Sequence, residues 1–75
     1  TMSATKYDNG NTSALQVIGN EGTNKLTILQ SPSFGKELMF TITDSDTATS
    51  VVVNDIETLR KIRDFLNESI HWMEA

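Results

Sequence analysis

Residues 51–59 constrain the fold more than any other part of the chain. Residues 51–53 are three valines, which favour a strand because β-branched side chains fit a pleated, half-buried surface. Asn54 stands three residues before Glu57, which is the spacing of a capping box at the start of a helix. Since only two residues separate strand from helix, we expect the helix to fold back onto the sheet that this strand completes.

The chain has 75 residues and no cysteine. A domain of this size is close to the lower limit at which a chain buries enough surface to fold without disulfides or metals. The absence of cysteine removes both disulfides and thiolate metal sites. Self-association is a common way to add buried surface to such a small domain, so an oligomer is expected.

The formal net charge is −4, from ten acidic and six basic residues. This balance argues against nonspecific binding to nucleic acid, which needs a basic footprint. It also argues against electrostatic attachment to an anionic membrane. No apolar run approaches the ~20 residues that span a bilayer, and no secretory signal is visible. Thr1 ahead of Met2 indicates the remnant of a cleaved tag. With neither an apolar span nor a secretory signal in the sequence, we expect a cytoplasmic protein.

Four strands are expected, at 14–18, 25–29, 38–43 and 49–53. Glycine, asparagine and aspartate fill the segments between them, and such short connections predict an antiparallel meander. Residues 1–12 are polar and rich in Asn, Thr and Gly, which indicates a flexible arm ahead of a single domain at 13–75.

A helix is expected at about 55–72, because apolar residues recur there at steps of three and four. The apolar positions are Ile56, Leu59, Ile62, Leu66, Ile70 and Met73, with Phe65 beside them. The predicted fold is therefore α+β, a four-stranded antiparallel meander with one C-terminal helix packed on one face.

Alternation along the strands predicts which sheet face the helix covers. Leu15, Val17, Leu26, Ile28, Phe40, Ile42, Val51 and Val53 should lie under the helix. The reverse face carries little charge, and its apolar residues are typical of a surface that a second sheet or a second copy covers. We expect Leu29, Met39, Thr41 and Val52 to form this oligomer or partner face; a plain half-wet sheet is the alternative.

Two aromatic residues have no assigned place in this scheme. Phe34 lies in the loop 31–35 and either folds back over the core or projects into a partner. Trp72 lies close to the end of the chain and is either an interface anchor or docks against its own sheet edge.

No spacing of residues points to catalysis or to a metal site. The one histidine, His71, is expected at the end of the helix, where a solvated residue or a partial cap is the common role. Arg60, Lys61 and Arg63 hold half of the basic charge and could bind phosphate, but flanking acids favour a salt-bridged solvated face. We therefore expect no enzyme and no cofactor.

The step from strand to helix over 49–66, after a short meander, is similar to many small phage and bacterial proteins of unknown function. The resemblance implies a viral accessory or anti-defence inhibitor that acts in the host cytoplasm. We expect a non-enzymatic interaction module that binds itself, as a homodimer or larger, and a host protein. The alternative is an oligomeric sponge that binds a nucleotide-like anion through Arg60, Lys61 or Arg63.

Overall fold

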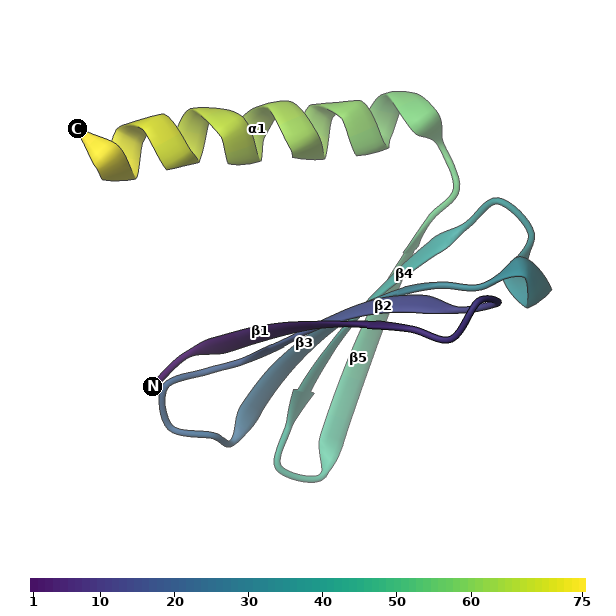
Figure 1. Cartoon of the computed structure of the whole chain (residues 1–75), viewed down its shortest axis with the longest axis horizontal. Coiled ribbons are helices and arrows are strands. Elements are labelled where there is room, and N and C mark those ends of the chain that lie inside the picture. Colours follow the sequence, from purple (N-terminus) through teal and green to yellow (C-terminus); the bar gives the residue numbers. More distant parts are fainter.

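The computed structural model describes all 75 residues except the side chain of Phe34. It contains one open sheet of five antiparallel strands in the order β1-β2-β3-β4-β5, followed by a single helix (Figure 1). The elements are β1 (Ser3–Asp8), β2 (Ser13–Ile18), β3 (Asn24–Gln30), the 3₁₀ turn η1 (Pro32–Phe34), β4 (Leu38–Asp44), β5 (Thr47–Val53) and α1 (Ile56–Glu74). The α+β class and the antiparallel meander are confirmed.

The sheet has one strand more than the sequence predicts. We expected residues 1–12 to form an arm, but β1 pairs with β2 along its whole length, from Ser3 with Ile18 to Asp8 with Ser13. The polar loop that follows is held by its own side chains. Asn9 Oδ1 accepts hydrogen bonds from the amides of Asn11 and Thr12, at 3.1 and 2.8 Å. These local bonds let an Asn-rich segment reverse the chain and return it as β2.

The remaining turns follow the predicted connections. Between β2 and β3, the amide of Gly19 donates to the carbonyl of Asn24 at 2.9 Å, and Gly22 takes a positive φ of 78° that suits glycine. Between β4 and β5 only two residues form the loop, and Ser45 has a positive φ of 55°. The predicted break at residues 31–35 is the η1 turn, where Ser31 Oγ accepts from the amide of Ser33.

The strand register separates two faces of the sheet as the alternation predicts. One face, called the apolar face below, holds Leu15, Val17, Leu26, Ile28, Leu38, Phe40, Ile42, Val51 and Val53. The other, called the mixed face, holds Tyr7, Gln16, Ile18, Thr27, Leu29, Met39, Thr41 and Val52. The membership of both faces is therefore confirmed for every residue that the sequence assigned.

Helix α1 begins one residue later than the capping box predicts. Asp55, not Asn54, is the N-cap, and its carboxylate Oδ2 accepts from the amide of Thr58 at 3.1 Å and from Thr58 Oγ1 at 2.7 Å. Glu57 is instead paired with Arg60 along the helix. The strand-to-helix connection is thus Asn54 and Asp55 alone, with Asp55 in an extended conformation.

The expectation that the helix packs on the sheet is wrong for the single chain. After its first turn α1 runs apart from the strands (Figure 1), and over the described residues it makes no extensive contact with any of them. Only Asn54 and Asp55 connect β5 to α1, and the helix that follows them stays apart from the strands. As a result, no apolar side chain that the structure describes is buried.

The molecule is open for its mass. Its accessible surface is 6142 Å², whereas a compact monomer of 8.3 kDa exposes about 4,600 Å². The radius of gyration is 13.6 Å, against about 11.3 Å for a compact domain of this length. Both quantities follow from a single-layer sheet and a detached helix.

Candidate self-association surface

The uncovered side of α1 is a continuous apolar stripe. Its line of aliphatic residues is Leu59, Ile62, Leu66, Ile70 and Met73, and Phe65 and Trp72 lie beside that line, seven residues apart. Phe65 is 67% exposed and Trp72 is 78% exposed. At 100° per residue, the apolar positions from Trp72 through Leu66 to Ile70 cover an arc of about 160°. A helix that meets one flat surface needs an arc of roughly 100°, so α1 has enough apolar surface for two contacts.

The apolar face of the sheet is equally uncovered. Ile42 and Val51 on adjacent strands are 61% and 62% exposed, although both were expected under the helix. On β2, Leu15 on the same face is 37% exposed. The chain thus presents two apolar surfaces, a sheet face and a helix stripe, that do not meet each other.

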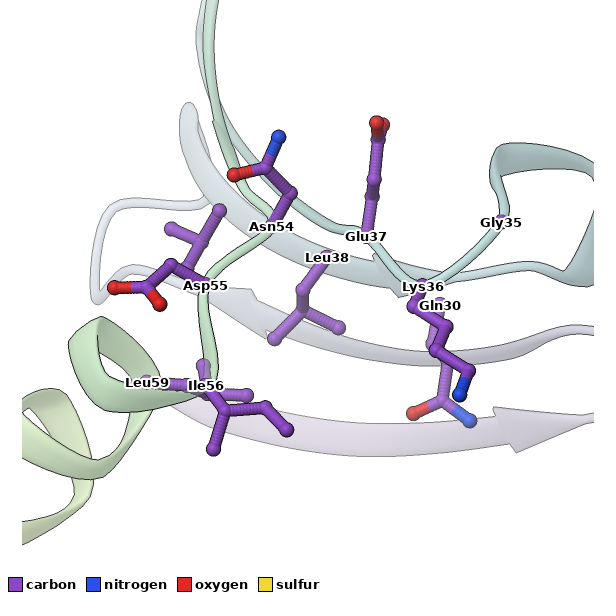
Figure 2. Close-up of a pocket in the computed structure, with 10 residues that line it drawn as sticks. Gln30, Gly35, Lys36, Glu37, Leu38, Asn54, Asp55, Ile56 and Leu59 are labelled. Carbon is purple, nitrogen blue, oxygen red and sulfur yellow. The ribbon is translucent and has the colours of Figure 1, made fainter.

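The apolar face is hollowed where α1 leaves the sheet (Figure 2). This hollow has a volume of about 440 Å³, and its apolar lining is Leu38, Val53, Ile56 and Leu59. Figure 2 shows Leu38 pointing toward the first turn of the helix, while Glu37, the residue before it, points the other way. Gln30 and Lys36 lie at the far rim. The lining combines these four aliphatic side chains with polar residues at the rim, among them Lys36, Asn54 and Asp55, so the hollow can take an apolar side chain that enters between polar groups.

A second hollow continues from the first across the apolar face. It has a volume of about 330 Å³ and is lined by Lys6, Ser13, Ala14, Leu15, Ile28, Gln30 and Leu38. The two hollows share Gln30 and Leu38. Together they form one depression, called the trough below, which crosses the sheet from β1 to the start of α1.

The predicted oligomer or partner residues on the mixed face do lie together. Leu29, Met39 and Val52 occupy one row across β3, β4 and β5. Thr41 lies on the same face, and its hydroxyl hydrogen bonds with Ser50 Oγ at 2.9 Å. Sequence reasoning missed Tyr7, which extends the same row onto β1 and is 54% exposed. The signal that could have predicted this strand is the alternation of Thr5 and Tyr7 with the charged residues Lys6 and Asp8.

The two aromatic residues assigned to the same site have different outcomes. The side chain of Phe34 lies outside what the structure describes, so both of its predicted roles stay predictions. Trp72 lies within α1 and away from the row on the mixed face. Its position beside Phe65 places it on the helix stripe, where a docking contact with its own sheet edge is not seen.

Arg60, Lys61 and Arg63 do not converge on one point. Arg60 pairs with Glu57, and Arg63 pairs with Asp64 at 2.9 Å. Helical spacing points the three side chains over an arc of about 160°. The geometry therefore gives the anion-binding alternative no support. In the part of the chain that the structure describes, no group of three or more His, Cys, Asp or Glu side chains could hold a metal ion.

Within the described residues, no helix combines the length and the apolar character that crossing a bilayer requires.

Comparison of the chain with protein-family models, with curated proteins and with solved structures gives no match.

Proposed function

We propose that this protein is a self-associating, non-enzymatic interaction module whose hydrophobic core forms between copies. The observation that carries the proposal is the surplus of surface, about 1,600 Å² beyond that of a compact monomer of the same mass. Two chains that each cover this surplus would bury about 3,200 Å² in total, which lies in the range of obligate homodimers. The helix stripe and the apolar face supply the apolar side chains for such an interface.

Size-exclusion chromatography with light scattering tests the proposal. We expect the wild-type chain to elute as a dimer or larger at micromolar concentration. Leu66→Glu places a charge in the middle of the stripe and should abolish association, because a buried unpaired charge costs several kcal/mol. Asn67→Glu, one residue along on the polar side of the helix, is the matched control and should leave the oligomer intact. A wild-type chain that stays monomeric and melts cooperatively at high micromolar concentration would refute the proposal.

The mixed face is then available for a different protein. Its row of Tyr7, Leu29, Met39 and Val52 is uncharged and partly exposed, and we propose it as the contact with a host component. In this role the protein is an accessory or anti-defence inhibitor that occupies a surface of its target. The acidic net charge of −4 would favour a target with a basic surface through electrostatic steering.

A pair of variants separates the two faces. Met39→Lys changes the mixed face and Phe40→Lys changes the apolar face, one residue apart on β4. We expect Met39→Lys to keep the oligomer and lose any host protein that the wild type captures, whereas Phe40→Lys should lose the oligomer. The reverse result would assign the mixed face to self-association.

A further inference from the structure

The trough and the helix stripe match each other in length. The trough crosses five strands, and four spacings of about 4.8 Å make it about 19 Å long. The stripe runs from Leu59 to Met73, and fourteen steps of 1.5 Å make it about 21 Å long. A helix laid across the strands in the trough would therefore place its whole apolar line against the apolar face.

The helix of the same chain does not lie in its own trough. Ile56 and Leu59 line the end of the trough beside β5, but the helix then runs away from the strands. Nothing within α1 can bend it back, since residues 56–74 contain neither glycine nor proline. A return would need a rotation at Asn54 and Asp55, the two residues that connect β5 to α1.

A second copy of the chain supplies a helix of the required length and chemistry. We propose that α1 of each copy lies in the trough of the other, so that two chains exchange helices reciprocally. Leu59, Ile62, Leu66 and Met73 would pack on the partner's apolar face. Phe65 and Trp72 lie on the flank of the 160° arc and would pack against the second helix of the dimer. This contact would cover the part of the stripe that the sheet does not reach. This inference rests on the proposed self-association and specifies its arrangement.

Isotope-filtered nuclear Overhauser measurements on a mixed sample test the exchange. One half of the protein is uniformly carbon-13 labelled, the other half is unlabelled, and the two are unfolded together and refolded. We expect contacts between protons of Ile62, Leu66 or Met73 and methyl groups of Leu15 or Ile28 to appear in the filtered spectrum, which reports only pairs from different chains. The same contacts seen only in the unfiltered spectrum of a fully labelled sample would mean that each helix covers its own sheet. The absence of these contacts in both spectra would mean that the helix does not cover the apolar face. Either of the last two results overturns the exchange.

Light scattering on the same sample separates this failure from failure of the proposed function. If the protein is a dimer but shows no contacts between the helix of one chain and the sheet of the other, the exchange is refuted and self-association is still supported. If the protein is a monomer, both proposals are refuted. Adjacent variants on β3 give an independent measurement. Ile28→Lys enters the trough and should weaken association at least tenfold, while Thr27→Lys, on the mixed face, should weaken it much less. Equal effects of the two variants would argue against the trough as the contact.

Discussion

Asp55 shows how a single residue determines where the helix starts. Asn54 and Asp55 are both good cap residues, and only the backbone decides which of them reaches an amide three residues ahead. The structure selects Asp55, because its carboxylate accepts both from the amide and from the hydroxyl of Thr58. The sequence spacing of Asn54 and Glu57 predicts the start of the helix to within one residue, but not which side chain makes the bonds.

The cap gives the stability of the protein a pH dependence. The hydrogen bond from the Thr58 side chain, followed by the bond from its amide, lowers the pKa of Asp55 below the ordinary value of 3.8. A carboxylate with a lowered folded-state pKa stabilises the folded state above its unfolded pKa, and this contribution is lost as the pH falls through the folded value. We therefore expect Asp55→Ala to lower the melting temperature at pH 7 by more than it does at pH 2. Asp55→Asn keeps a cap without a titrating group, so its melting temperature should fall less than that of Asp55→Ala, and this advantage over Ala should persist in acid. Thermal melts of the three proteins across this pH range provide the measurement.

Ser45 is strained by the tight connection between β4 and β5. Its φ of 55° lies in the left-handed region, which costs a residue with a Cβ about 1–2 kcal/mol. Glycine adopts this conformation freely, although it loses more entropy on folding. Ser45→Gly should therefore stabilise the protein by roughly 0.5–1 kcal/mol. Urea unfolding at one protein concentration measures the change. Ser50→Gly, in the middle of β5, is the control and should destabilise the protein instead.

At the scale of the element, periodicity predicts whether a segment is a helix or a strand better than it predicts what that segment packs against. The helix at 55–72 and the strands from 14 onward agree with the structure to within a few residues, since their apolar residues repeat at the right period. Strand β1 was missed because composition outweighed alternation. Residues 1–12 are rich in Asn, Thr and Gly, and Tyr7 is their only aromatic residue, so the segment resembles a disordered arm. Pairing with β2, rather than burial, defines this strand.

A single sequence does not predict which surface the apolar stripe of α1 packs against. Periodicity shows that Leu59 and Leu66 must leave water, but it does not distinguish the chain's own sheet from that of a partner. Likewise, the alternation on β4 places Met39 and Phe40 on opposite faces of the sheet. It does not show which face self-associates, and the sequence assigned that role to the mixed face only because the helix was expected to cover the apolar face. Once the helix is placed elsewhere, the apolar face becomes the stronger candidate.

The flank of α1 offers an optical measurement of assembly. Trp72 is the single tryptophan of the chain and is 78% exposed in the isolated copy. If the flank packs against a second helix, dilution should shift the emission of Trp72 to longer wavelength as the oligomer dissociates, because the indole returns to water. Leu66→Glu should show the long-wavelength emission at every concentration. An emission maximum that does not change with concentration, in a protein that light scattering shows to dissociate, would place Trp72 outside the interface.

At the scale of the whole molecule, the proposed self-association would couple stability to protein concentration. The described side chains include no buried apolar residue, so a lone chain lacks the main stabilising contribution to folding. An obligate oligomer has no stable folded monomer, and its melting temperature depends on protein concentration.

We therefore expect the melting temperature to rise steadily as the protein concentration is increased a hundredfold, when it is followed by far-ultraviolet circular dichroism. A melting temperature that is constant over this range would indicate that the chain folds alone. Leu66→Glu serves as the control, since a chain that cannot associate should show no cooperative transition at any of these concentrations.

The order of the strands has a consequence for the speed of folding. Every strand pairs with its neighbour in the sequence, so the loops that must close are short and the sheet has a low contact order. Hairpins of this kind form in roughly 1–10 µs, whereas in the proposed exchange two chains must collide before the helix of one can dock on the sheet of the other. Refolding should accordingly end in a second-order phase whose rate rises in proportion to chain concentration, preceded by fast phases that do not depend on it. Stopped-flow refolding at several concentrations would resolve the two steps, and a final phase with a constant rate would show that docking happens within one chain.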